Sequence, residues 1–265
     1  MIVKCKQSDI DLILSYIGND YPKCLYLFLN VNKYGLEHGR IEAFIQYCKG
    51  DISSVMLQYY SCLHIYSKDN YFDNEELTDF IFSKKELTML YCEASTADKI
   101  ASNLSKKTDK QFSVTKGWVA QINALKTTPN GLAEKAESKD FEQIVKMIYD
   151  DEDIGRSYKY DELAKQLEER NKEGYSRNLV IKDNELVIAH ACTNAEFENV
   201  SVVAELLVRK EYRRQGHASE IWGDICKELL EEGKEVYSFY YSFESRALHK
   251  KLGFEEVCEW SKIVF

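Results

Sequence analysis

The stretch Ala204-Glu-Leu-Leu-Val-Arg-Lys-Glu-Tyr-Arg-Arg-Gln-Gly-His-Ala-Ser219 leads an apolar strand through a short basic turn into a long amphipathic helix. Apolar residues recur at three- and four-residue steps from Ala218 to Leu230, and Gly233 occupies the position of a C-terminal cap. The helix is therefore expected to begin near Gly216. Because the first turn of a helix leaves backbone N–H groups unpaired and carries the positive end of the helix dipole, this junction is expected to bind an anion.

The residues of the turn favour a phosphate or a pyrophosphate. Arg213 and Arg214 place positive charge just before the helix. Gly216 lets a ligand approach the backbone closely, and Ala218 keeps the next position small. We expect His217 to contact the anion through its backbone N–H more than through its ring. We expect the anion to be held by the backbone N–H groups of Arg214, Gln215, Gly216, His217, Ala218 and Ser219.

Two motifs in this half of the chain resemble those of one family. The hexapeptide Arg213-Arg-Gln-Gly-His-Ala218 resembles the Gln/Arg-x-x-Gly-x-Gly/Ala signature of the GNAT superfamily of acyl-CoA-dependent N-acyltransferases. The segment Ser242-Phe-Glu-Ser-Arg-Ala-Leu-His-Lys-Lys-Leu-Gly-Phe254 resembles the family's late helix, which typically reads Asn-x-x-Ala/Ser-x-x-Leu-Tyr-x-x-x-Gly-Phe. The predicted strand 235–241 separates the two motifs, as in the family. The resemblance covers roughly residues 139 to 265.

The resemblance implies a fold, a cosubstrate and an activity. The fold is α/β (α+β), with a mixed, mostly antiparallel sheet flanked by helices. Acetyl-CoA, or another acyl-CoA, would be the cosubstrate, and no metal is implied. The expected activity is that of an N-acetyltransferase, which moves an acetyl group to a primary amine of a small molecule or peptide by direct attack in a ternary complex. The alternative is a non-catalytic acyl-CoA-binding regulatory module.

The resemblance also implies which residues contact the cofactor arm. In the family, the strand before the anion loop separates from its neighbour and presents backbone groups to the pantetheine arm and the thioester oxygen. In this sequence that position falls on Leu206, Leu207 and Val208. Ser242 and Ser245 stand where the family has small polar residues that touch the arm, although Ser242 replaces the commoner Asn.

Two ionisable side chains are candidate catalytic residues. Glu205 is the only ionisable residue in the apolar strand 202–208. A carboxylate there is costly unless it faces a cleft or a partner, so Glu205 is a candidate general base; a paired or solvated carboxylate on the outer side of the sheet is the alternative. His249 stands where the family usually has Tyr, so the resemblance implies a general acid that protonates the leaving thiolate. The alternative for His249 is a ring that only packs.

An acidic loop is relevant to the charge of the amine that would accept the acyl group. Four carboxylates follow one another at Asp150, Asp151, Glu152 and Asp153, between the first two predicted helices of the C-terminal half. In the family this loop borders the acceptor cleft, so the resemblance favours a cationic amine. The alternative is a solvated acidic loop that caps the following helix.

The order of predicted elements suggests two domains in tandem. Residues 1–125 form an α/β domain, with a helix at 7–18 and a second apolar segment at 23–34 whose type the pattern leaves open; further strands and helices follow. Residues 126–138, which contain one of only two prolines, are the expected linker, and residues 139–265 form the GNAT N-acetyltransferase domain.

The first domain is expected to lack the cofactor site. The segment after Tyr66, where a pyrophosphate loop would fall, reads Ser-Lys-Asp-Asn-Tyr-Phe-Asp-Asn-Glu-Glu and is acidic. Acidic side chains repel a pyrophosphate. Residues 1–125 are therefore interpreted as a degenerate GNAT-like copy, with an unrelated α/β cap domain as the alternative.

Composition limits the class of protein. The 265 residues are 45% hydrophobic and 30% charged, as in a soluble globular protein, and no uncharged run approaches a membrane span. The net charge of −9 argues against a nucleic-acid partner, which would require clustered Lys and Arg. The eight cysteines are scattered without a C-x-x-C pair, which favours buried free thiols in the cytoplasm. The protein is expected as a monomer or a homodimer, with an acyl-CoA and an amine as its partners and no membrane contact.

Overall fold

The computed structural model describes residues 1–108, 111–152, 154–155 and 159–265. Contacts divide the chain into two compact units, the first made of residues 1–119 and 257–265 and the second of residues 120–256. The predicted boundaries of 1–125 and 139–265 differ from these units in three respects. Residues 120–125, predicted in the first domain, lie in the second unit. Residues 257–265 group with the first unit, and residues 126–138, the expected linker, lie within the second.

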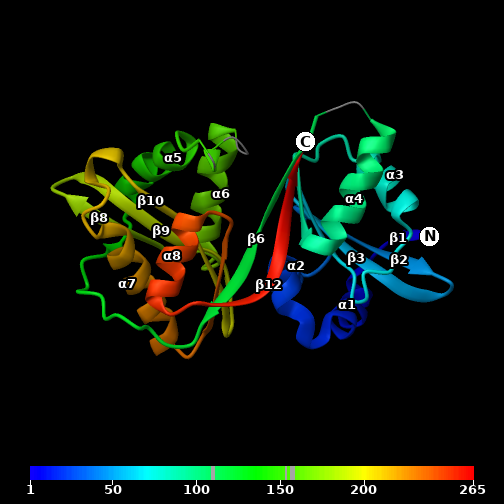
Figure 1. Ribbon diagram of the computed structural model, residues 1–265, viewed down its shortest axis with the longest axis horizontal. Helices are drawn as coiled ribbons and strands as arrows, with labels where there is room; N and C mark the ends of the chain where they lie inside the picture. Colours follow the sequence, from blue (N-terminus) through cyan, green and yellow to red (C-terminus); the bar gives the residue numbers. More distant parts are fainter. Residues whose placement is uncertain (109–110, 153, 156–158) are drawn as a thin grey trace. The chain divides into compact units, whose positions relative to one another are not determined.

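The first unit has helices on both faces of a sheet (Figure 1). Its strands follow the order β1-β2-β3-β4-β5-β12, and every adjacent pair is antiparallel except β4 with β5. The strands are β1 (Ile2–Lys4), β2 (Ile41–Cys48), β3 (Asp51–Tyr59), β4 (Cys62–Tyr66), β5 (Met89–Glu93) and β12 (Glu255–Val264), with β6 (Ser113–Ile122) running from the first unit into the second. The helices are α1 (Ile10–Ile17), α2 (Leu25–Tyr34), α3 (Asn74–Ser83) and α4 (Ala94–Lys107).

Strand alternation explains why both faces of this sheet are covered. In β2, Ile45 packs in one core with residues of α1 and α2, whereas its neighbour Phe44 packs in another core with residues of α3 and α4. In β3, Val55 and Met56 divide in the same way. Successive side chains of a strand point to opposite faces, so a strand that is apolar on both faces requires helices on both. The segment 23–34, whose type the pattern left open, supplies α2.

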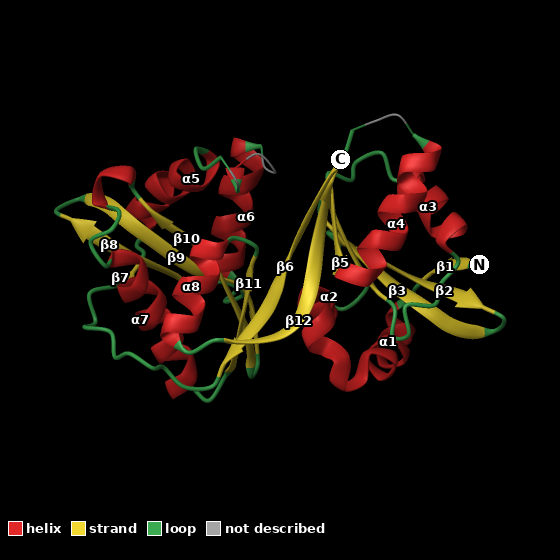
Figure 2. Ribbon diagram, in the orientation of Figure 1, coloured by secondary structure: helices red, strands yellow, loops and turns green. Residues whose placement is uncertain are grey.

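The second unit repeats this order of elements. The strands are β7 (Glu134–Lys135), β8 (Asn178–Asp183), β9 (Leu186–Phe197), β10 (Val200–Val208) and β11 (Glu235–Tyr240), and the helices are α5 (Phe141–Tyr149), α6 (Tyr160–Lys172), α7 (His217–Glu231) and α8 (Phe243–Leu252). The strands lie in the order β7-β8-β9-β10-β11, and all pair antiparallel except β10 with β11. Figure 2 shows α5 and α7 on opposite sides of these strands. The mixed, mostly antiparallel sheet flanked by helices confirms the predicted fold class.

The two units have the same succession of helices and strands. In the first, two helices, three antiparallel strands, a helix, a parallel strand and a helix follow one another from α1 to α4; the second has the same succession from α5 to α8. The anion-binding junction predicted from the sequence is the one between β10 and α7. The equivalent junction of the first unit lies between β4 and α3.

The expected linker is packed on α7. Gly223 leaves space for Pro129, whose Cβ lies 3.1 Å from the position that a Cβ of residue 223 would take. The backbone N–H of Ala133 donates to the buried carboxylate of Asp224 at 2.9 Å. Residues 134–135 then pair with β8 as β7. Sequence periodicity could not indicate this packing, because the partners of the segment lie about 90 residues further along the chain.

Candidate active site

The N-terminus of α7 presents a row of unpaired amides. The N-cap is Gly216 in a left-handed conformation with φ +93°, and Arg214 is also left-handed with φ +62°. No heavy atom lies within 4 Å of the place that a Cβ on Gly216 would occupy. Within the described ranges, no backbone hydrogen bond outside the helix is donated by any residue from 214 to 219, and the first three amides of the helix have no intrahelical acceptor. Six successive amides thus have no acceptor in this part of the chain, and unpaired amides at the start of a helix favour an anion such as a pyrophosphate.

Strand β10, which leads to this turn, separates from its parallel neighbour β11. The parallel pairing of β10 with β11 runs from Val200 and Glu235 to Val203 and Ser238. Beyond this point, in the described part of β11, β10 pairs only with β9, from Ala204 to Val208. The backbone of residues 204–208 is therefore open on the β11 side. The expected contacts of Leu206, Leu207 and Val208 with the cofactor arm fall on this open edge and stay a prediction.

A β-bulge interrupts β10 at Glu205. The pairing with β9 shifts register between Ala204 and Leu207, and Glu205 has φ +55°, which is unusual for a residue other than glycine. Its side chain is 8% exposed. Oε2 accepts a hydrogen bond from the thiol of Cys192 at 3.3 Å, whereas buried Oε1 has no hydrogen-bond partner among the described residues. Such a backbone outlier costs of the order of 1–3 kcal/mol and is typical of functional sites.

The environment of Glu205 favours its neutral form. Burial raises the pKa of its carboxyl above the ordinary value of 4.5, while the charge of Arg170 and the hydrogen bond from Cys192 oppose that shift. Arg170 is itself buried and donates to the backbone oxygen of Asn194 at 3.3 Å. A carboxylate whose pKa is raised is a stronger base, which is the property that a general base requires. The structure therefore gives Glu205 suitable chemistry, although the cavity described below is lined by Leu207 and Val208 and not by Glu205.

His249 lies inside the domain. Its side chain is 4% exposed, and its ring packs against Tyr240, with ring centroids 4.5 Å apart. Nδ1 lies 2.6 Å from the backbone oxygen of Ser245, and Nε2 lies 2.8 Å from Oγ of Ser238. A carbonyl oxygen only accepts, so Nδ1 carries the proton and neutral Nε2 accepts from the serine hydroxyl.

This geometry favours a packing role for His249. Burial lowers the pKa of the ring to about 4, so the ring is neutral near pH 7. Neither nitrogen then has a proton free for a leaving thiolate. The general-acid role of His249 stays a prediction, and the alternative of a ring that only packs has the better structural support.

The two serines of the late helix hold its first turn. Ser242 is the N-cap of α8, and its Oγ accepts from the backbone N–H of Ser245 at 3.0 Å. The Oγ atoms of Ser242 and Ser245 also lie 2.9 Å apart. Serine is as good an N-cap as asparagine, which explains how the helix tolerates the replacement of the family's commoner Asn. Contact of either serine with a cofactor arm stays a prediction.

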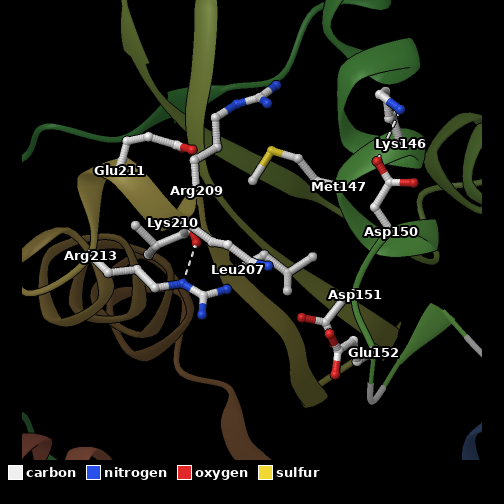
Figure 3. A pocket seen from close by; sticks show the side chains of 11 residues that line it. Lys146, Met147, Asp150, Asp151, Glu152, Leu207, Arg209, Lys210, Glu211 and Arg213 are labelled. Carbon is white, nitrogen blue, oxygen red and sulfur yellow. Dashed lines mark hydrogen bonds and ion pairs between the residues drawn. The ribbon is translucent and has the colours of Figure 1, made fainter.

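A cavity of about 540 Å³ joins the end of β10 to the acidic loop (Figure 3). The loop side contributes Lys146, Met147, Asp150, Asp151 and Glu152, and the strand side contributes Leu207, Val208, Arg209, Lys210, Glu211 and Arg213. Three of the four predicted acidic residues thus lie at a cavity beside the anion-binding turn. The fourth, Asp153, lies outside the described residues.

Several residues of this region had no signal in the sequence. Cys192 contacts Glu205 only because the bulge shifts the register of β9 against β10. Lys210 and Arg209 line the cavity because the chain turns sharply after β10, where Arg209 donates to the backbone oxygen of Val187 at 2.6 Å. Arg213, expected to add charge to the turn, donates from Nε to the backbone oxygen of Val208 at 2.9 Å.

At the equivalent junction of the first unit, a carboxylate occupies the N-terminus of the helix. Asp73 caps α3, and its carboxylate accepts from the backbone N–H groups of Glu75 and Glu76 at 3.1 and 3.0 Å. The amides that would face a phosphate are thus already bonded to a negative group. Glu75 and Glu76 add two further carboxylates in the same turn.

Residues 141–254 match the model of the acetyltransferase (GNAT) family, and this part of the chain is a GNAT domain. No curated protein matches the sequence at a significant level.

Solved structures show the same fold over the whole chain. A Drosophila protein is similar with a TM-score of 0.70 and 10% identity, covering 100% of this chain and 98% of its own. A GNAT-family acetyltransferase from Colwellia psychrerythraea has a TM-score of 0.61 and 12% identity, with coverage of 100% and 99%. A tandem GNAT protein from the clavulanic acid biosynthesis pathway has a TM-score of 0.58 and 9% identity, with coverage of 100% and 98%. The last of these fits a first unit that is a second GNAT-like domain.

The described residues contain neither a membrane-spanning helix nor a cluster of metal ligands. None of the helices in the described ranges is both long and apolar enough to cross a bilayer. Among the same residues, no group of three or more His, Cys, Asp or Glu side chains is arranged to hold a metal ion.

Proposed function

We propose that the protein is an N-acetyltransferase that moves an acetyl group from acetyl-CoA to a primary amine of a small molecule or peptide, by direct attack in a ternary complex. The row of open amides from Arg214 to Ser219, directly beside the separated strands β10 and β11, carries this proposal. The amides would hold the pyrophosphate, and the open edge of residues 206–208 would receive the pantetheine arm. The bound thioester would supply the acyl group. An oxygen that gains negative charge during transfer would need a donor, which a free N–H of this edge can provide.

The proton balance assigns a task to Glu205. The amine nitrogen forms its bond to the acyl carbon as the carbon–sulfur bond breaks; the nitrogen loses one proton and the departing thiolate gains one. In this proposal Oε1 of Glu205, which has no partner in the described part of the chain, takes the proton from the amine. Its raised pKa supports this assignment. Because the ring of His249 is neutral and fully hydrogen-bonded, we propose that the thiolate takes its proton from solvent.

Two measurements test the proposal. Incubation with acetyl-CoA and a panel of primary amines should release free thiol in proportion to the acetylated amine. Binding of CoA should raise the melting temperature of the protein, because a ligand that binds only the folded state stabilises it. Stabilisation by CoA without thiol release from any amine would leave a binding protein and exclude the transferase.

The burial of the two candidate catalytic side chains favours a second candidate function, a non-catalytic acyl-CoA-binding module. Glu205 and His249 are 8% and 4% exposed, and neither lines the cavity. A non-catalytic acyl-CoA-binding module would have the same amide row without an accessible base. The thiol-release assay separates this function from the transferase.

We also propose that the protein is cytoplasmic. All eight cysteines lie in the described ranges and all are free thiols. Free thiols persist in a reducing compartment, which supports a cytoplasmic protein.

A further inference from the structure

The cavity beside the anion-binding turn has charges of opposite sign on its two sides. Asp151 and Glu152 belong to the loop after α5, whereas Lys210 and Arg213 belong to the connection between β10 and α7. In Figure 3, the side chains of Lys210 and Arg213 extend toward the side on which Asp151 and Glu152 lie. Glu211 lies beside Arg209, away from Glu152. A ligand in this cavity would therefore meet negative charge at one end and positive charge at the other.

Most of the cavity's basic side chains are already engaged. Lys146 forms an ion pair with Asp150 at 2.9 Å. Arg209 donates to the backbone oxygen of Val187 at 2.6 Å. Arg213 donates from Nε to the backbone oxygen of Val208 and lies in the turn proposed for the pyrophosphate. Lys210 is different, because its ammonium forms no hydrogen bond or ion pair with any described residue.

On the loop side of the cavity, Glu152 is the acidic residue that lacks a partner, as Lys210 does on the strand side. Asp150 is paired with Lys146, and Oδ1 of Asp151 accepts from the backbone N–H of Ile154 at 3.1 Å. The carboxylate of Glu152 forms no hydrogen bond or ion pair within the described ranges. Among the described residues that line the cavity, the ammonium of Lys210 and the carboxylates of Glu152 and Glu211 thus have no partner. Of these two carboxylates, only Glu152 belongs to the loop side, opposite the strand side that contributes Lys210.

We infer that the acceptor is zwitterionic: an amine that also carries a carboxylate, with its ammonium recruited by Glu152 and its carboxylate bound by Lys210. This inference rests on the proposed acetyltransferase function and narrows its substrate class. A simple cationic amine would leave Lys210 facing another positive charge, which is unfavourable, whereas an amine with a carboxylate satisfies both sides. The apolar side chains of Leu207 and Met147 then contact the carbon chain between the two charged groups.

The test compares amines in matched pairs that differ only by a carboxylate, such as lysine with cadaverine, ornithine with putrescine, and arginine with agmatine. Acetyl-CoA is kept saturating and thiol release gives kcat/KM. We expect at least one aminocarboxylate to exceed its decarboxylated partner by about tenfold or more, because a charge-assisted hydrogen bond is lost without the carboxylate. Equal or better use of the decarboxylated amine in every pair would overturn the inference.

Variants assign the preference to the two side chains. Lys210→Gln should raise KM for the preferred aminocarboxylate about tenfold, because the charged partner of the carboxylate is lost. The same variant should lower KM for the decarboxylated amine, because the repulsion between two positive charges is removed, so that the preference disappears. Glu152→Gln should raise KM for both members of the pair. Lys227→Gln is the matched control, because Lys227 lies on α7 in an ion pair with Glu231 and does not line the cavity. A preference that survives Lys210→Gln would contradict the inference.

A binding measurement separates failure of this inference from failure of the proposed function. Calorimetric titration of the preferred aminocarboxylate into the full chain with CoA present should show binding that Lys210→Gln weakens and Lys227→Gln does not. Binding without thiol release would support the zwitterion site and exclude the transferase. Acetylation of simple amines without binding of any aminocarboxylate would support the transferase and exclude the zwitterion site.

Discussion

The thiol of Cys192 in β9 donates a hydrogen bond to Oε2 of Glu205 in β10 across 3.3 Å. Both side chains are buried, and burial raises the pKa of the Cys192 thiol as well as that of the Glu205 carboxyl. The thiol therefore acts as a neutral donor to the carboxyl oxygen. This contact lies at the bulge, where β10 departs from regular pairing with β9. It therefore places the Cys192 thiol beside the candidate general base.

Glu205→Gln should separate activity from stability. If Glu205 is the base, kcat falls by about 10²- to 10⁴-fold. Because its folded-state pKa is raised, the stability that the group contributes is present at low pH and is lost as pH rises through the folded pKa. The neutral Gln variant should therefore melt at a higher temperature than the parent at pH 8, with a smaller difference at pH 5. A variant with the parent kcat would remove Glu205 from the chemistry.

Cys192→Ala should move the pH dependence of the reaction. The hydrogen bond from the thiol lowers the pKa of Glu205, so its loss raises that pKa further. The base is then protonated up to a higher pH, and the acid limb of the kcat profile moves upward. Profiles of the parent and Cys192→Ala, measured with the same amine at saturation, check this shift. Superimposable acid limbs would show that another group titrates.

Gly216→Asp should weaken CoA binding at least tenfold. The substitution introduces a carboxylate beside the open amides and a Cβ at φ +93°, which is strained for any residue except glycine. Gly233→Asp is the matched control, since Gly233 is also left-handed, with φ +76° and nothing within 4 Å of its Cβ position, but lies after the other end of α7. Titration of CoA into both variants compares them. Equal CoA affinity in the two variants would place the anion elsewhere.

His249→Ala should act mainly on stability. The variant loses two hydrogen bonds and a ring packed against Trp222, Tyr240 and Phe254, so the free energy of unfolding should fall by roughly 2–4 kcal/mol. Urea unfolding measures this loss, and kcat at low temperature, where the variant is folded, should stay within a few-fold of the parent. If His249 is the general acid instead, kcat falls far more than acyl-CoA affinity and His249→Tyr retains activity.

Acid should destabilise the fold through three buried histidines. Burial lowers the pKa of His249 to about 4 and that of His64 and His190 to about 3, against an ordinary value of 6.5. The unfolded chain binds more protons between these values, so stability is present above pH 6.5 and falls as pH drops through this window. Each ring can contribute up to about 1.4 kcal/mol per pH unit. Urea unfolding between pH 7.5 and 4.5 should show a steep loss, and His64→Gln should reduce the slope.

One CoA should bind per chain. The amides of Glu75 and Glu76 at the start of α3 are bonded to the carboxylate of Asp73, and both residues add negative charge to the same turn, so we expect no anion to bind there. Calorimetric titration of CoA should give a stoichiometry of one, and Gly216→Asp should abolish the whole signal. A second binding event that survives in that variant would show a cofactor site in the first unit.

Elements with strong local signals could be predicted from the sequence. The helix after Gly216 was expected to end before Gly233, and α7 spans His217–Glu231 with Gly233 left-handed just beyond it. The open amides at the start of this helix were predictable for the same reason, since unpaired amides follow from the helix itself, whereas the anion that they would bind stays a prediction. The role of residues 126–138 was not, because Ala133 and Pro129 are fixed by contacts with α7 that are distant in sequence.

Most of the element order, the open amides at residues 214–219 and the acidic turn at the equivalent place in the first unit could be predicted from the sequence. The two turns were predictable because each depends on residues within one helical turn of each other. The environments of Glu205 and His249, in contrast, depend on contacts between segments that are distant in sequence. The bulge sets Glu205 against Cys192, and the packing of α8 on β11 sets His249 against Ser238. Burial and hydrogen-bond partners determine a pKa, and both come from residues distant in sequence. The same holds for the cavity, whose opposed charges meet only when the loop after α5 and the end of β10 lie side by side.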